Sequence, residues 1–298
     1  MSTVPPPRKK LEELIARYRL EPVIRDVFVE GRSDTNLISR FLRSRHLHNV
    51  VVYEISSVEI PPQALANVAQ PDSARGRIIF LAFHFQENLP SESRTATCVA
   101  DREYDVLLKN NFNCPFLLFL DHSSLEMYAF DPEVLDSLLS AVAPSLGKKG
   151  EAVLAELESM LQRLFVIRTT NILLDLRLEW LPSFSDSCIL TGTSVQFDEN
   201  DFIHRYLGKN ARLKEKARFI EELGVVTSRM SGDRRLFIRG HDFVTALSWY
   251  LRNSVSKSSP LYRPETLHQL LLAYIDPSRI SNQQFFRELV ARMSQPVK

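Results

Sequence analysis

Acidic side chains follow three short apolar segments of this chain. They are Glu30 after VIRDVFV, Asp101 with Glu103 and Asp105 after TCVA, and Asp121 with Glu126 after PFLLFL. Carboxylates a few ångströms apart repel each other unless a cation neutralises them. Carboxylate oxygens are also the ligands that Mg²⁺ and Mn²⁺ prefer, and such ions commonly drive in-line displacement at phosphorus. The set therefore predicts a divalent-metal site for phosphoryl chemistry.

The order of these acids carries the prediction, because one carboxylate after a strand is more often a helix N-cap or a solvated loop residue. We expect Asp34 to be such a cap. Gly31 would let the backbone approach a substrate or metal closely, although a simple tight turn explains it equally well. His122, beside Asp121, is interpreted as a structural residue rather than a proton shuttle.

The elements that must position these acids form an α/β pattern. We expect a helix over 11–20, strands over 23–29 and 50–55 with a helix between them, and further strands over 97–100 and 115–122. The segment 73–88 fits either a strand or a helix, and we expect a helix. Strand, helix and strand in succession predict a parallel sheet flanked by helices, whose ligands bind at the carboxyl ends of the strands.

The second half of the chain is mainly helical in pattern. The expected helices cover 133–142, 150–181, 199–224, 241–253, 264–275 and 282–294, with one short strand over 189–197. The predicted organisation is a tail and helix over 1–22, an α/β metal-binding domain over 23–147 and a mainly helical domain over 148–298. We expect the first ten residues to be a frayed tail.

Composition excludes several classes of protein. The 298 residues contain 37 Lys+Arg and 36 Asp+Glu, so there is no global basic footprint for nucleic acid. Only 9 glycines are present, and neither G-x-x-x-x-G-K-[ST] nor G-x-G-x-x-G occurs, which argues against a nucleotide-driven motor or a dinucleotide enzyme. Three widely spaced cysteines and the lack of a long apolar run predict a cytoplasmic protein with no membrane contact.

Local basic residues offer a place for a polyanion. The run is Lys209, Arg212, Lys214, Lys216 and Arg218. These side chains would line a helix face that follows a phosphate backbone. The alternative is a solvated helix face that is balanced by neighbouring glutamates. In Gly240-His241-Asp242, His241 would contact phosphate or orient a carboxylate, whereas the alternative has Asp242 cap a helix while His241 packs.

The segments VFVEGRSD, CVADREYD and LFLDHSSLEMY resemble the signature of TOPRIM domains, the metal-dependent fold of topoisomerases, primases and OLD-type nucleases. Together with IRGHD they resemble more closely a bacterial TOPRIM-like family that includes the AriB nucleases of PARIS anti-phage defence systems. The resemblance covers roughly residues 20 to 275. It implies that Mg²⁺ is held by Glu30, as ligand or general base, and by Asp101.

The resemblance also assigns the remaining acids. Glu103 stands where the family has the second Asp of a D-x-D pair, and its extra methylene moves the carboxylate farther from the backbone. Asp105 is the neighbouring acid that would substitute for it. Glu126 matches the acidic position after the fourth strand, where Asp121 is the weaker candidate.

The family further implies an endoribonuclease that cleaves tRNA during phage infection. An AriA-like ATPase subunit would hold it inactive until a phage trigger releases it, and the active form would be a homodimer. Two alternatives stay open. One is a TOPRIM-like nuclease that acts on DNA, since contacts to the 2′-hydroxyl cannot be seen in a sequence. The other is a TOPRIM-fold interaction module without catalysis, for which Glu103 is the argument.

Overall fold

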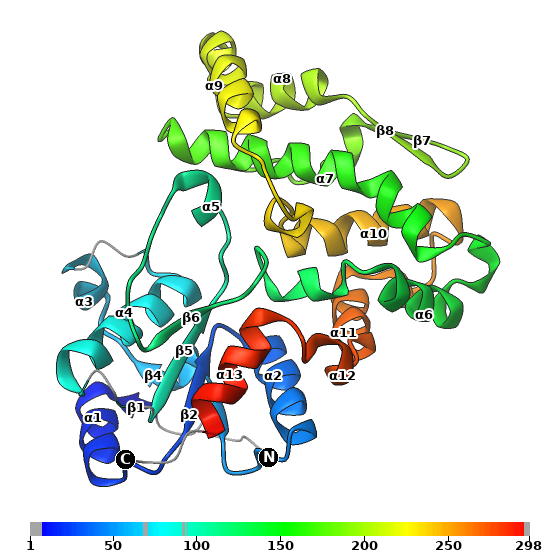
Figure 1. Ribbon diagram of the computed structural model, residues 1–298. Coiled ribbons are helices and arrows are strands. Elements are labelled where there is room, and N and C mark those ends of the chain that lie inside the picture. Colours follow the sequence, from blue (N-terminus) through cyan, green and yellow to red (C-terminus); the bar gives the residue numbers. More distant parts are fainter. Residues whose placement is uncertain (1–7, 68–70, 91–92, 94, 295–298) are drawn as a thin grey trace, which may run out of the picture. The chain divides into compact units, whose positions relative to one another are not determined.

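A computed structural model describes residues 8–67, 71–90, 93 and 95–294. The chain divides into two compact units (Figure 1). Unit 1 contains the described residues up to Asp101, the segment Phe112–Asp121 and the chain from Asp276 onward. Unit 2 contains Arg102–Asn111 and His122–Ile275.

Unit 1 is built on a four-stranded parallel sheet with the strand order β3-β2-β5-β6. The strands are β2 (Asp26–Val29), β3 (Val51–Glu54), β5 (Ala96–Ala100) and β6 (Leu117–Phe119). In the register, Phe28 lies opposite Tyr53 on one side and Cys98 on the other. All four strands therefore end at the same edge of the sheet.

Helices cover both faces of this sheet. Phe28 packs in a core with residues of α1 (Leu11–Leu20) and α4 (Ala74–Asn88), and the rings of Phe28 and Phe85 are 5.8 Å apart. Because side chains alternate along a strand, the buried Val27 and Val29 point to the other face. There α2 (Arg32–Ser44) and α13 (Gln284–Ser294) lie together, with the rings of Phe41 and Phe286 4.5 Å apart (Figure 1).

Smaller elements complete unit 1. They are β1 (Lys9–Lys10), η1 (Ile55–Ser57), β4 (Val58–Glu59), α3 (Pro62–Asn67) and α12 (Pro277–Ile280). The predicted frayed tail is wrong at its end, because Lys9 and Lys10 pair in parallel with β4. Residues 1–7 of that tail lie outside the described residues.

Unit 2 is mainly helical. Its elements are α5 (Asp105–Leu108), η2 (Leu125–Ala129), α6 (Pro132–Val142), η3 (Pro144–Leu146), α7 (Gly150–Leu173), η4 (Ser185–Ser187), β7 (Cys188–Thr191), β8 (Ser194–Phe197), α8 (Glu199–Lys209), η5 (Leu213–Glu215), α9 (Lys216–Ser228), η6 (Arg234–Leu236), α10 (Gly240–Ser254), η7 (Pro260–Tyr262) and α11 (Pro264–Tyr274). The long helix α7 packs against α6, α9 and α10 and buries one face along most of its length (Figure 1).

The α/β class, the parallel sheet flanked by helices and the helical second half are confirmed. Some boundaries are wrong. The strand predicted over 189–197 is the antiparallel hairpin β7–β8, because Gly192 takes φ +63° at its turn. The helix predicted over 199–224 is two helices, since Ala211 adopts φ +53° between them. The helix predicted over 150–181 ends at Leu173, just before Asp175 with φ +47°.

The two units do not follow the predicted division at residue 147. The chain crosses from unit 1 to unit 2 at Asp101 and again at Asp121, and it returns to unit 1 at Asp276. The return is fixed by α13, where the Arg292 guanidinium donates to the Pro115 carbonyl oxygen at 2.8 Å. Within the described residues, no helix is long and apolar enough to cross a membrane.

Candidate functional site

Glu30 and Asp101 lie at the carboxyl ends of the neighbouring strands β2 and β5 in unit 1. Each acid is the first residue after its strand. The backbone N–H of Asp101 donates to Glu30 Oε1 at 3.0 Å, so the structure brings these two predicted residues together. The Arg75 guanidinium donates to the Asp101 carbonyl oxygen at 2.9 Å and fixes the chain there. The sequence predicts both acids at this edge of the sheet, and the strand order of the structure makes them neighbours.

The turn after Glu30 leads directly into α2. Gly31 is the N-cap residue of this helix, and its N–H donates to Asp34 Oδ2 at 2.9 Å. Asp34 is therefore not the N-cap that the sequence predicts. It lies at the third helical position and reaches back to the cap, because the helix begins at Arg32, three residues before Thr35, where a helix capped by Asp34 would begin.

Asp121 occupies a helix-capping position in unit 1. Its two carboxylate oxygens accept the backbone N–H of Phe285 at 3.0 and 3.2 Å. This N–H belongs to the first turn of α13 and has no partner within that helix. Asp121 thus joins the end of β6 to the C-terminal helix, which is a structural use of the carboxylate.

The other predicted acids belong to unit 2, where Ser123 joins three loops. The Glu103 N–H donates to the Ser123 carbonyl oxygen at 2.8 Å, and the Ser123 N–H donates to the Arg235 carbonyl oxygen at 3.2 Å. The Ser123 hydroxyl donates to the carbonyl oxygen of Ile238. We call the segments 102–105, 122–126 and 233–242 the three-loop cluster. It unites the acidic REYD loop, the HSSLE loop and the segment that ends in RGHD.

Glu103 and Asp105 differ in their surroundings within this cluster. Glu103 is exposed and has φ +43°, a left-handed conformation that Asp and Asn adopt more readily than Glu. Asp105 is buried, begins α5, and accepts the Asn110 side-chain amide at 3.0 Å. Asp105 is thus committed to its own helix, whereas Glu103 is the accessible acid of this loop.

Glu126 is a buried anion that joins three elements of unit 2. Its Oε1 lies 2.9 Å from His268 Nε2 on α11. Its Oε2 lies against Gly240, where a Cβ would collide with Glu126 and Ser124. Burial by itself would raise the pKa of Glu126, but the contact with His268 and the nearby Ser124 hydroxyl lower it to about 2. The sequence does not indicate His268, because it is 142 residues away and fits no motif.

The histidines predicted as supporting residues are in different environments. His122 is buried, and within the described residues its ring nitrogens have no hydrogen-bond partner. Burial and charge repulsion from Arg235 and Arg102 together lower its pKa to about 4, while Asp233 opposes the shift. His241 is exposed on the first turn of α10, with its ring 6.1 Å from that of His268.

Asp242 does not cap α10 in the way the sequence suggests. It lies at the third position of the helix and accepts Arg168 Nε and Nη2 at 2.9 and 3.0 Å. Arg168 also stacks on the Trp180 ring at 3.5 Å. The pair joins α7 to α10, so Asp242 is a structural anion, and sequence patterns do not connect it to Arg168.

The predicted basic run does not form one helix face. Lys209 ends α8, Arg212 and Lys214 lie between the helices, and Lys216 and Arg218 begin α9. The Lys209 ammonium donates to Glu179 and to the Trp180 carbonyl oxygen at 2.9 and 2.8 Å. The other four basic residues of the run stay predicted substrate contacts. They lie at the bend between α8 and α9 and in the first turn of α9.

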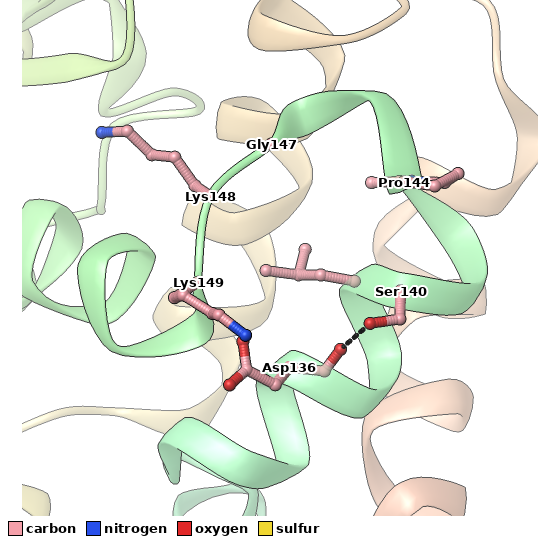
Figure 2. Close-up of a pocket in the computed structure, with 8 residues that line it drawn as sticks. Asp136, Ser140, Pro144, Gly147, Lys148 and Lys149 are labelled. Atoms are coloured by element: carbon pink, nitrogen blue, oxygen red, sulfur yellow. Dashed lines mark hydrogen bonds between the residues drawn. The ribbon is translucent and has the colours of Figure 1, made fainter.

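A pocket of about 310 Å³ lies elsewhere in unit 2, where α6 ends and α7 begins (Figure 2). Its polar groups serve the helix ends: Asp136 Oδ1 accepts the Gly150 N–H at 2.6 Å, and the Ser140 hydroxyl donates to the Asp136 carbonyl oxygen at 2.7 Å. The Lys148 ammonium contacts Glu156 and the Thr193 carbonyl oxygen, both at 3.4 Å. No predicted site residue lines this pocket.

Among the described residues, no group of three or more His, Cys, Asp or Glu side chains is arranged to hold a metal ion. The pair Glu30 and Asp101 still fits Mg²⁺, because this ion is often bound through one or two carboxylates and completes its shell with water and substrate phosphate.

No model of a known protein family matches this chain, and no curated protein matches its sequence.

Proposed function

We propose that this chain is a metal-dependent TOPRIM-like nuclease whose Mg²⁺ or Mn²⁺ is held by Glu30 and Asp101. The supporting observation is the pair of acids at the ends of neighbouring parallel strands, joined by the 3.0 Å hydrogen bond from Asp101 to Glu30. The carboxyl edge of a parallel sheet is where such folds bind their ligands. Oxygen donors at that edge suit a hard divalent cation.

The bound ion would supply Lewis acidity and activate a water for attack on a phosphodiester. The chain's own contribution is to hold its ligands in place. The Asp101 N–H fixes one oxygen of Glu30, and Arg75 fixes the Asp101 carbonyl. These contacts position the Glu30 carboxylate and the Asp101 backbone before any substrate arrives, which lowers the cost of assembling the site.

The acids of unit 2 enter the proposal with different support. Glu103 is exposed and lies two residues after Asp101, so it is the next ligand or base that we propose. Asp105 and Glu126 stay predicted ligands, although each carboxylate already accepts a hydrogen bond within unit 2. Variants of Glu103 therefore test the third position more directly.

The substrate and partners rest on the family resemblance. We propose tRNA as the substrate, an AriA-like ATPase as the subunit that restrains the nuclease, and a homodimer as the active form. The sequence has no phosphate-binding loop of its own, which is consistent with a separate ATPase.

Cleavage assays test this function directly. The purified chain is incubated with labelled tRNA or duplex DNA in Mg²⁺, in Mn²⁺ or in EDTA. Glu30→Gln keeps an oxygen to accept the Asp101 N–H but removes the charge, and Glu59→Gln, an exposed acid on β4, is the matched control. We expect tRNA cleavage that needs the metal and falls at least about 100-fold in Glu30→Gln but not in Glu59→Gln.

Each other outcome has a defined meaning. Cleavage of DNA alone would overturn the tRNA assignment while keeping the nuclease. No cleavage of either substrate by the folded chain would favour the interaction module. Equal activity of wild type and Glu30→Gln would remove Glu30 from the centre of the mechanism.

A further inference from the structure

The Arg239 side chain lies beside Asp242 but donates no hydrogen bond to another described residue. It precedes α10, its side chain is 41% exposed, and its ion-pair contact is Nη1 to Asp242 Oδ1 at 3.6 Å. In the part of the chain that the structure describes, Arg239 donates no hydrogen bond from its side chain. Five N–H donors on a planar fork are thus available to a ligand.

The positive charge of Arg239 is also only weakly balanced by its ion-pair partner, Asp242. Asp242 is already neutralised by Arg168, which binds both carboxylate oxygens at 2.9 and 3.0 Å. One carboxylate therefore faces two guanidinium groups, and the closer one takes its hydrogen bonds. The neighbouring arginines differ, since Arg234 pairs with Glu158 and Arg235 pairs with Asp233. Arg234 and Arg235 each approach their carboxylates within hydrogen-bond distance, whereas Arg239 stands 3.6 Å from a carboxylate that Arg168 already binds.

The position of Arg239 links it to the acidic loop of unit 2. The Ser123 hydroxyl donates to the carbonyl oxygen of Ile238, the residue before Arg239. The carbonyl oxygen of the same Ser123 accepts the Glu103 N–H at 2.8 Å. The backbone at Arg239 is thus tied through Ser123 to the loop that carries Glu103.

We propose that Arg239 binds a phosphate group of the nucleic-acid backbone through its unoccupied guanidinium fork. Arginine is suited to this ligand because its planar donors match two phosphate oxygens at once. The ion pair with Asp242 holds the side chain in place, so that less conformational entropy is lost when phosphate binds. The inference rests on the proposed nuclease function and adds a substrate-binding residue outside the predicted basic run.

The test measures binding rather than cleavage. All proteins carry Glu30→Gln, so that the probe stays intact, and fluorescence anisotropy follows the binding of labelled tRNA at several salt concentrations. Arg239→Gln removes the charge, and Arg239→Lys keeps the charge but removes the fork. Arg252→Gln is the matched control, because Arg252 is exposed near the other end of the same helix, about 20 Å away.

We expect Arg239→Gln to weaken binding about 5- to 10-fold and to lower the salt slope by about one, as the loss of one phosphate contact does. The affinity of Arg239→Lys for tRNA should lie between those of the parent and Arg239→Gln. Arg252→Gln should bind tRNA as tightly as the parent. Folding should survive, because Asp242 keeps Arg168, and thermal unfolding checks this. Equal binding by the parent and Arg239→Gln, or equal weakening by Arg252→Gln, would overturn the proposal.

The binding test and the proposed nuclease activity fail in different ways. If the wild type cuts neither tRNA nor DNA while Arg239→Gln still weakens tRNA binding, the nuclease proposal fails and the phosphate contact stands. If the wild type cuts tRNA but Arg239→Gln binds it as tightly as its parent, the activity stands and this contact is wrong.

Discussion

At the residue scale, carboxylates of the same type serve different purposes in this chain. Glu30 lies at a strand end and accepts the N–H of Asp101. Asp121, Asp242 and Glu126 instead close helix ends or bind a basic side chain. What separates them is the partner on a distant segment, and not the acid or its neighbours in sequence.

His122 gives a prediction about pH at this scale. Its folded pKa is lowered to about 4 by burial and by two arginines, whereas an unfolded histidine titrates near 6.5. A lowered folded pKa stabilises the fold above pH 6.5, and this contribution is lost as the pH falls from about 6.5 towards 4. When the pH is lowered from 7.5 to 5, we expect the free energy of unfolding to fall by about 2 kcal/mol because of His122.

Urea unfolding of wild type and His122→Phe at pH 7.5 and pH 5 measures this cost. Phe keeps an aromatic ring beside Tyr128, whose ring is 4.8 Å away, but it cannot bind a proton. The wild type should lose more stability than the variant between the two pH values. The same loss in both proteins would show that His122 is not held neutral in the folded state.

At the element scale, two helical glycines differ in how closely other residues pack against them. Gly240 begins α10 at a place where the Glu126 carboxylate and the Ser124 hydroxyl occupy the space of a Cβ. At Gly224, in the middle of α9, no described atom outside the backbone of its own helix lies within 4 Å of a Cβ built there. The first glycine is required by packing, whereas the second only weakens its helix.

The two glycines therefore predict opposite effects of the same substitution. Gly240→Ala should destabilise the protein by about 2 kcal/mol or more, because overpacking a buried site displaces its neighbours. Gly224→Ala should stabilise it by about 0.5–1 kcal/mol through the higher helix propensity of alanine. Chemical denaturation of both variants provides the comparison. A neutral Gly240→Ala would contradict the close packing of Glu126 against α10.

The longer helices and the four strands of the parallel sheet can be predicted from the sequence, because apolar periodicity is a local property. The helices over 11–20, 73–88 and 264–275 lie within a residue or so of their predicted bounds. The hairpin β7–β8 could not be predicted from periodicity, since its turn depends on the left-handed backbone of Gly192. The sequence places Glu30 and Asp101 at one sheet edge, but their adjacency depends on the strand order that the structure shows. The Glu126–His268 contact spans 142 residues and leaves no local signal.

At the scale of the whole molecule, the units are not continuous segments of the chain. Unit 1 takes its last helices from the C-terminal part of the chain, and α13 brings Phe285 and Phe286, both nearly fully buried, to unit 1. Phe286 packs against Phe41 of α2. Local patterns could not predict this return, because the helix itself resembles any other amphipathic helix.

A chain that ends at Ile275 should therefore lose the stability of unit 1, although it keeps all four strands. Removing α13 uncovers Phe41 and leaves Asp121 without its helix N-terminus. We expect amides of β2 and β5 to lose protection from hydrogen exchange. Phe286→Ala in the full chain should act in the same direction by about 3–5 kcal/mol. Unchanged protection in the shortened chain would contradict the packing of α13 on unit 1.

The central claim is that acids at the sheet edge hold a divalent ion, and a direct titration with Mn²⁺ tests it. Electron paramagnetic resonance counts free Mn²⁺ as the full chain is added, for wild type, Glu30→Gln and the control Glu59→Gln. We predict saturable binding by wild type and Glu59→Gln that is at least 10-fold weaker in Glu30→Gln. Binding that is equally tight in all three proteins, or absent from the folded wild type, would contradict the claim.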